Sequence, residues 1–226
     1  CEILKSVSAA VRGRSGIEET RVAIGKKEAQ FMNRVITISR QYGSGGRELG
    51  EKLAERLGIP FYDKELINMI AKEGNIETAV LEAYDEVAPD FDNYSLRDVP
   101  PDYQIAQTQK LYAAQCRVIS DLPAKGPCVM VGRCADAILA DAVRIFVYAD
   151  MERRKDRIAG LFPELSRDQV EKRIVTVDKK RKEYHEYYST KDWGEMEGYD
   201  LCLNTGLIGV DGCLEAALTY IGFVKD

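Results

Sequence analysis

Apolar and amphipathic stretches alternate along most of this chain. The run VITI at 35–38 is dense in β-branched residues, as a buried strand is, and leucines recur every four residues between 49 and 57 on one face of a helix. The same alternation predicts strands at 34–39, 59–62, 127–131, 143–149 and 199–204, and helices at 46–57, 64–73, 103–122, 151–160, 166–188 and 211–222. Strands that alternate with helices favour an α/β fold in which a parallel sheet is flanked by helices.

A glycine-dense turn separates the first predicted strand from the first predicted helix. Glycines allow positive φ and bring backbone N–H groups close to an anion, and the first helical turn adds unpaired N–H donors and the positive end of the helix dipole. The turn therefore predicts a cradle for the phosphates of a nucleotide such as ATP. Its candidate binding residues are Gly43, Ser44, Gly45, Gly46, Arg47 and Glu48.

The turn departs from the phosphate-binding pattern GxxxxGK[ST]. In one register the four defining positions hold Gln41, Gly46, Arg47 and Glu48. Arg47 then replaces the lysine as the cation on the phosphates and is a candidate catalytic residue, while a carboxylate replaces the hydroxyl that normally contacts Mg²⁺. Shifting the register by one residue places Arg40 and Gly45 in the glycine positions and Gly46 in the lysine position, which is a poorer match.

Two other interpretations of the turn stay open. It is a tight strand-to-helix turn whose glycines serve geometry alone, or it belongs to the dinucleotide-binding pattern GxGxxG, which Gly43 and Gly45 match and Glu48 does not. Asp63 lies 20 residues after Gly43, where the ribose-binding acid of that pattern is expected. A dinucleotide site would not explain the basic segments further along the chain, whereas a site for the phosphates of ATP would, so the sequence favours the ATP site.

Composition narrows the class of protein. The 226 residues are 45% hydrophobic and 31% charged, which suits one sizeable globular domain. No stretch approaches the ~20 apolar residues that cross a bilayer, and the N-terminal residues lack the pattern of a secretory signal, so we expect a cytoplasmic protein without a membrane partner. Six cysteines without a CxxC pair and a single histidine predict reduced thiols and no protein-bound metal site.

Charge is distributed unevenly along the chain. The net charge of −5 disfavours a nucleic-acid partner. Positive charge nonetheless gathers at 152–157 and at 171–182, which suits a small polyanion.

Within the second basic segment, an apolar stripe runs along the predicted helix through Ile174, Val177, Tyr184 and Tyr188. Arg181 fills the gap in this stripe and should therefore point inward. An inward arginine in a polar cleft needs an anion, and phosphate suits its bidentate fork, so Arg181 is a candidate catalytic residue.

In the first basic segment, Arg153, Arg154 and Arg157 follow a plausible N-cap at Asp150. We expect one of them, Arg157 in the first place, to reach the transferred phosphate, and ordinary ion pairing is the alternative. His185, in EYHEYY, is interpreted as a packed or surface residue rather than a base.

Three segments together resemble the cytidylate kinase-like family of P-loop nucleoside monophosphate kinases. They are ITISRQYGSGGRELGEKLAERLGIPFYDKELI, VMVGRCADAIL and DKKRKEYHEYY, and the resemblance covers about residues 33–224. It implies a core at 32–60, 126–150 and 199–226, a monophosphate-binding region at 61–125 and a lid region at 151–198 that closes over ATP. Residues 1–31, which begin with Cys rather than Met, are treated as an N-terminal extension of uncertain origin to a kinase-like domain at 32–226.

The resemblance also implies roles for single residues. The glycine turn and Arg47 would hold the donor phosphates, and Asp63 and Arg133 would bind the acceptor monophosphate. Two positions depart from the family pattern, because Lys64 stands where relatives carry a hydroxyl and Cys134 stands where they carry an aspartate. A surface turn arginine is the alternative interpretation of Arg133.

The function implied is transfer of the γ-phosphoryl group of ATP, with Mg²⁺, to a nucleoside monophosphate, with CMP or dCMP as the preferred acceptor. Small nucleotides are then the partners, and the oligomeric state is left open. Two alternatives remain. One is a nucleotide-binding regulator without catalysis, motivated by the missing lysine, and the other is a P-loop kinase for a different small acceptor.

Overall fold

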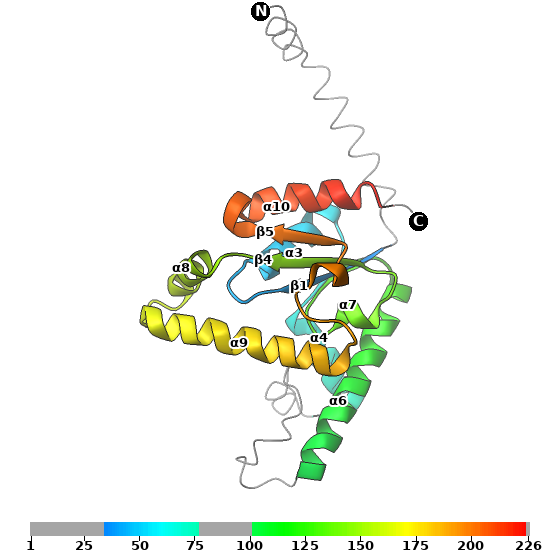
Figure 1. The fold of residues 1–226 in the computed structure, drawn as a ribbon. Helices are drawn as coiled ribbons and strands as arrows, with labels where there is room; N and C mark the ends of the chain where they lie inside the picture. The colour runs from blue at the N-terminus through cyan, green and yellow to red at the C-terminus, as the bar shows by residue number, and fades with distance from the viewer. Residues whose placement is uncertain (1–33, 77–100, 225–226) are drawn as a thin grey trace, which may run out of the picture.

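Five parallel strands form the centre of the computed structural model, which describes residues 34–76 and 101–224 (Figure 1). The strands are β1 (Val35–Arg40), β2 (Phe61–Tyr62), β3 (Cys128–Val131), β4 (Val143–Tyr148) and β5 (Leu201–Asn204), in the spatial order β2-β3-β1-β4-β5. Every pairing is parallel. All five strands therefore end at the same edge of the sheet, and this confirms the predicted α/β class.

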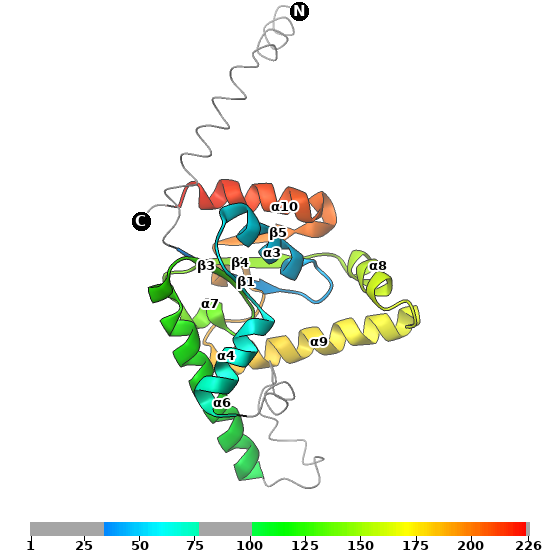
Figure 2. The ribbon, with the colours of Figure 1, turned by 180° about the vertical axis from the view of Figure 1, so that it is seen from behind.

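Helices cover both faces of the sheet (Figures 1 and 2). On one face lie α3 (Gly46–Leu57) and α10 (Thr205–Ile221), and on the other lie α4 (Lys64–Gly74), α6 (Pro101–Asp121) and the short α7 (Ala135–Ile138). The alternation of β1 explains the two cores, since Ile36 and Ile38 pack toward α3 and α10 while Val35 packs toward α4 and α6. β3 divides its side chains between the same two cores.

Two helices follow the carboxyl end of β4 and form a smaller unit. α8 (Met151–Leu161) begins at Asp150, whose side chain accepts from the Arg153 N–H, and α9 (Arg167–Tyr188) begins with a capping box between Ser166 and Gln169. Ile158, Val170 and Ile174 form the buried core between them. α9 then runs along the sheet toward α6, so its two ends contact different parts of the molecule (Figure 1).

Most predicted elements agree with the structure to within two residues. The main correction concerns the last helix, which begins at Thr205 instead of 211 and contains a non-helical residue, Gly209, with φ 69°. The short helices α7, η1 (Pro123–Lys125) and η2 (Met196–Gly198) were not predicted, because elements of this length carry no hydrophobic period. The extension 1–31 lies outside the described residues, as does the polar stretch 85–102 apart from Pro101 and Asp102, which open α6. None of the described helices is long and apolar enough to cross a membrane.

Candidate active site

The glycine turn lies between the end of β1 and the start of α3. Gly43 and Gly45 have φ of 81° and 82°, a left-handed conformation that glycine adopts without strain. A Cβ at Gly45 would lie 2.9 Å from Val210 Cγ2, so space as well as conformation requires glycine there. The first N–H groups of α3 have no partner within the helix and point out of its N-terminus. The turn therefore has the backbone geometry of an anion site.

The Ser44 side chain is turned into the protein, so its hydroxyl is not left to face a phosphate. Its side chain is 2% exposed, and its hydroxyl donates to the carbonyls of Gln41 at 2.8 Å and Val147 at 3.0 Å. The Ser44 carbonyl in turn accepts from the Thr205 hydroxyl at 2.6 Å. Ser44 is thus an anchor that fastens the turn to β4 and to the start of α10.

The Arg47 side chain leaves the turn and reaches the predicted acceptor residues. Its Nε donates to Asp63 Oδ2 at 2.7 Å, and Arg133 Nη1 lies 3.5 Å from Asp63 Oδ1. The hydrogen bond to Asp63 raises the pKa of Arg47 above its ordinary value. The structure therefore brings Arg47, Asp63 and Arg133 together, and it directs the Arg47 guanidinium away from the lysine-like position expected from the sequence.

Arg157 instead lies beside the glycine turn. Its guanidinium carbon is 3.2 Å from the point where a Cβ of Gly45 would stand, and its Nη2 forms an ion pair with Glu48. Glu48 also pairs with Lys52 at 3.0 Å. Burial by itself would raise the pKa of Glu48, but the hydrogen bonds from Arg157 and Lys52 hold that pKa below its ordinary value. A cation from α8 thus occupies the surroundings of the α3 N-terminus.

Arg133 is held in a rare backbone conformation. Three consecutive residues, Gly132, Arg133 and Cys134, have φ of 77°, 57° and 53°. Left-handed conformations of non-glycine residues are costly and persist where the surroundings enforce them. Here Gln115 Nε2 donates to the Arg133 carbonyl at 2.7 Å, and the Tyr184 hydroxyl donates to Gln115 Oε1 at 2.9 Å. Arg133 is only 4% exposed, so the interpretation as a surface turn arginine is wrong.

Arg181 points inward, as its place in the apolar stripe predicted. Its Nη1 donates to the Arg40 carbonyl at 3.2 Å, and its guanidinium lies 5.6 Å from the centre of the Tyr42 ring. A cavity of about 10 Å³, enough for roughly one water molecule, is lined by Arg133, Arg181 and Ser39, among other residues. Arg133 and Arg181 therefore share one small cavity near the carboxyl ends of β1 and β3.

A buried polar network that the sequence did not predict adjoins this cavity. His185 Nε2 lies 2.8 Å from Asp136 Oδ2, and the Ser39 hydroxyl donates to Asp136 Oδ1 at 3.2 Å. All three side chains are buried, with His185 3% exposed. His185 is thus a packed residue, but one with a specific carboxylate partner. The only sequence signal was Asp136, which stands two residues after the position where the family carries an aspartate.

The other arginines of the first basic segment behave differently from Arg157. Arg153 is exposed, while Arg154 is buried and forms an ion pair with Asp178 of α9. Asp178 also accepts a hydrogen bond from the backbone N–H of Tyr42, in the glycine turn, at 2.7 Å. The sequence reasoning missed Asp178, although its spacing of three residues from Arg181 and seven from His185 places all three on one helical face.

The carboxylates near the turn are paired with basic side chains. Each already has a partner: Glu48 has Arg157, Asp63 has Arg47, Asp136 has His185 and Asp178 has Arg154. Within residues 34–76 and 101–224 no group of three His, Cys, Asp or Glu side chains is arranged to hold a metal ion. Mg²⁺ often binds chiefly through substrate phosphates and water. The expectation of Mg²⁺ therefore rests on the family resemblance and on no residue of this site.

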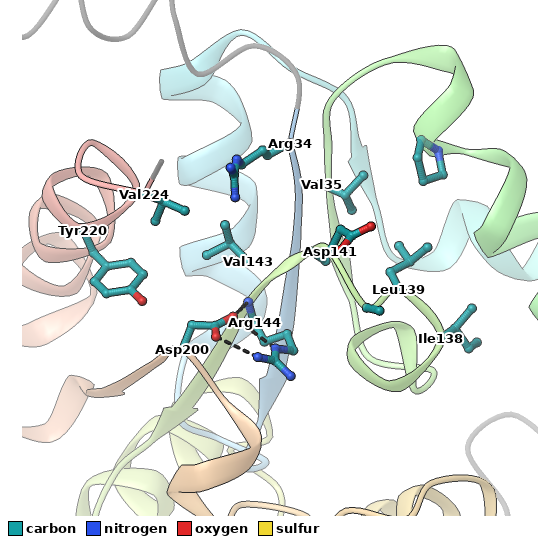
Figure 3. A pocket seen from close by; sticks show the side chains of 13 residues that line it. Arg34, Val35, Ile138, Leu139, Asp141, Val143, Arg144, Asp200, Tyr220 and Val224 are labelled. Atoms are coloured by element: carbon teal, nitrogen blue, oxygen red, sulfur yellow. Dashed lines mark hydrogen bonds and ion pairs between the residues drawn. The ribbon is translucent and has the colours of Figure 1, made fainter. Parts of the chain in front are cut away.

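A much larger cavity, ≈ 810 Å³, lies at the opposite edge of the sheet (Figure 3). It is lined by residues at the amino-terminal ends of β1, β4 and β5, including Val35, Val143 and the pair Arg144–Asp200. Arg144 Nη2 and Asp200 Oδ1 are 2.8 Å apart, so these charges satisfy each other. None of the predicted site residues lines this cavity.

A family model and curated relatives point to the same family. The sequence profile of the cytidylate kinase-like family matches residues 35–207. A cytidylate kinase of Methanothrix thermoacetophila is 26% identical over 84% of this chain and 99% of its own length, and one of Pyrococcus horikoshii is 27% identical over 85% and 92%. A crystal structure of an uncharacterized protein from Eubacterium ventriosum superposes with a TM-score of 0.66 at 26% identity, covering 84% of this chain and 99% of that one.

Proposed function

Because this chain belongs to the cytidylate kinase-like family, we propose that it transfers the γ-phosphoryl group of ATP to a nucleoside monophosphate. The observation that carries the proposal is the gathering of arginines at the carboxyl edge of the sheet. Arg157 lies beside Gly45 of the glycine turn, and Arg181 lies near the ring of Tyr42. Arg133 lies next to them, where it meets Arg47 at Asp63 and shares a small cavity with Arg181. Ligands of open α/β sheets bind at this edge. Phosphoryl transfer needs alignment and charge neutralisation more than covalent help from the protein, and arginines near the unpaired amides of the turn would supply both.

On the donor side, the backbone N–H groups from Gly43 to Glu48 would bind the ATP phosphates. Arg157 would supply the cation that the missing lysine supplies in the pattern GxxxxGK[ST], since its guanidinium already lies beside Gly45. Glu48 holds Arg157 there before the nucleotide arrives. Arg47 would contribute its backbone N–H to the donor, while its side chain fixes Asp63.

On the acceptor side, Asp63 and Arg133 would bind the monophosphate, and Arg181 would neutralise the migrating phosphoryl group. Arg133 and Arg181 line the same small cavity, which would have to widen to admit a phosphate between them. The acceptor is already an anion, so the reaction requires no general base. The division into core, monophosphate-binding region 61–125 and lid region 151–198 is part of this proposal, with water exclusion as the purpose of the lid.

CMP or dCMP is the proposed acceptor, supported by the names of the archaeal relatives. Lys64 and Cys134, where the family pattern has a hydroxyl and an aspartate, are the positions at which this chain would differ in acceptor recognition. Mg²⁺ would arrive with ATP, bound to its phosphates, and no step is assigned to it.

A nucleotide-binding regulator without catalysis is the second candidate. The observation that favours it is the Arg47–Asp63 hydrogen bond, which keeps the one cation in the loop sequence away from the loop itself. Such a protein would bind ATP saturably and form no diphosphate.

One assay separates the two functions. ADP release is measured with Mg²⁺ and ATP over a panel of nucleoside monophosphates, and ATP binding is measured separately by calorimetry. If the protein is a kinase, the rate of ADP release should depend on the acceptor that is added, and CMP or dCMP should give the highest kcat/KM. ATP binding without acceptor-dependent ADP release would favour the regulator. A higher kcat/KM with another monophosphate would change the proposed acceptor and leave the proposed kinase activity in place.

A further inference from the structure

Tyr42, in the middle of the glycine turn, is held through its backbone by two side chains from different helices. Its N–H donates to Asp178 Oδ1 at 2.7 Å, and its carbonyl accepts from Arg154 Nη1 at 3.4 Å. Asp178 and Arg154 also form an ion pair with each other. Arg154 belongs to α8 and Asp178 to α9, so one ion pair joins both helices to one residue of the turn.

Arg154 is buried and Asp178 is partly buried, which makes the pair sensitive to the loss of either charge. Arg154 is 6% exposed, and its Nε has no hydrogen-bond partner in the described part of the chain. The neighbouring Gly43 packs directly on α8, because a Cβ there would lie 3.1 Å from the Arg154 carbonyl oxygen. A buried charge that loses its partner is strongly unfavourable, so Arg154 and Asp178 depend on each other.

Asp178 is the first of three residues on one face of α9 that contact the carboxyl end of β1 and its surroundings. Arg181 follows and donates to the Arg40 carbonyl, and His185 then pairs with Asp136, which accepts from Ser39. Through these contacts α9 packs against the end of β1 and the start of the glycine turn. Asp178 is the member of the three that binds the backbone of the turn itself.

The side chain of Tyr42 is also surrounded by α9. Its hydroxyl accepts from Arg173 Nε at 3.0 Å, and its ring lies 5.8 Å from the Arg173 guanidinium. These contacts fix the ring, whereas the Arg154–Asp178 pair fixes the orientation of the peptide groups on either side of Tyr42. The peptide after Tyr42 supplies the N–H of Gly43, the first glycine of the turn.

We propose that Asp178 and Arg154 are positioning residues for the phosphate-binding turn. By holding both backbone polar groups of Tyr42, they set the direction of the N–H groups from Gly43 to Gly46 and thereby the affinity of the turn for a nucleoside triphosphate. The proposal rests on the proposed function only in that the turn receives the ATP phosphates. It adds that a residue of α9 orients the backbone of a phosphate-binding turn whose own sequence lacks the usual lysine.

The test compares Asp178→Asn with Glu171→Gln. Glu171 joins the same two helices through Lys155 at 2.9 Å, and no contact to the turn is found for it in the part of the chain that the structure describes. Asp178→Asn keeps an acceptor oxygen but removes its charge and leaves Arg154 without a counter-charge. It should raise the KM and the calorimetric Kd for ATP at least about tenfold, as expected for weakening a charge-assisted hydrogen bond, and leave the KM for the acceptor within about twofold. Glu171→Gln should leave all three constants within about twofold.

The outcomes separate positioning from general stability. Equal losses of melting temperature in both variants, with ATP affinity unchanged in Asp178→Asn, would make the pair a structural brace and overturn the proposal. If Asp178→Asn does not fold, the double variant Asp178→Asn/Arg154→Gln removes both charges, leaves none unpaired, and should show the same weakening for ATP.

Failure of the proposed function gives a different result. A wild-type protein that binds ATP but forms no product with any monophosphate would disprove the kinase, while the Kd comparison would still decide on the positioning role. A wild-type protein that does not bind ATP at all would overturn the positioning role itself.

Discussion

The two edges of the sheet differ sharply. At the carboxyl edge, left-handed backbone and half-buried or buried arginines gather around a cavity of about 10 Å³. At the amino-terminal edge the cavity measures ≈ 810 Å³, and its Arg144–Asp200 pair is already satisfied. The larger cavity is thus the one with fewer side chains suited to binding a phosphate. Volume alone would select the amino-terminal edge, whereas backbone strain and cations favour the carboxyl edge, where we propose the active site.

The difference follows from the direction of the chain. In a parallel sheet every strand delivers its carboxyl end to one edge, and the helices that follow begin there with unpaired N–H groups and a positive dipole end. Arginines from α8 and α9 add to this positive potential. The amino-terminal edge receives the carboxyl ends of helices instead, so it has fewer unpaired N–H groups and less positive potential with which to bind an anion. Three experiments test this contrast.

Removing one arginine from each edge should give the largest contrast. Arg157→Ala should lower kcat/KM by an amount that corresponds to about 2 to 4 kcal/mol of transition-state stabilisation, as expected for losing one strong electrostatic donor in an active site. Arg144→Ala should leave kcat/KM unchanged and reduce the free energy of unfolding by about 1 kcal/mol, because its pair with Asp200 is partly exposed. Steady-state kinetics and urea unfolding of both variants provide the measurements. Similar kinetic losses in the two variants would contradict the assignment of the site to one edge.

Two glycines at opposite ends of α3 give an intermediate contrast. Gly45 and Gly58 have φ of 82° and 66°, so alanine at either position should cost about 1 to 2 kcal/mol of stability. At Gly45 the new Cβ would also meet Val210 and Arg157, whereas at Gly58 no atom lies within 4 Å. Gly45→Ala should therefore weaken ATP binding as well, and Gly58→Ala should not. Calorimetric titration with ATP distinguishes them, and equal ATP affinities would remove Gly45 from the phosphate site.

The smallest effect concerns acid stability at the amino-terminal edge. Burial would raise the pKa of Asp200, but its hydrogen bonds from the Arg144 side chain and backbone hold that pKa below its ordinary value. A carboxyl whose pKa is lower in the folded state stabilises the protein above its unfolded pKa of about 3.9, and this contribution disappears as the pH falls through the folded pKa. Asp200→Asn should therefore be less stable than wild type at pH 6, and the gap should shrink below about pH 4. Urea unfolding across this range measures the gap, and a constant gap would show that Asp200 acts through packing rather than charge.

Local patterns predicted much of this molecule because they report on single elements. The apolar run at 35–38 and the leucines of 46–57 predicted β1 and α3, and the glycines between them predicted the turn. The inward position of Arg181 followed from helical spacing. The start of α10 was missed because Gly206 and Gly209 interrupt its first turns and resemble a loop.

The sequence by itself determined the α/β class, the position of the glycine turn and the inward position of Arg181, since each depends on residues close together in the chain. Only the tertiary structure decided which charges meet. It turned Arg47 toward Asp63, brought Arg157 to Gly45 and joined Asp178 to the backbone of Tyr42. Tyr42 and Asp178 are 136 residues apart, and no periodicity or motif relates them. Such pairings depend on how α8 and α9 pack against the end of β1, which brings together charges that are far apart in the sequence.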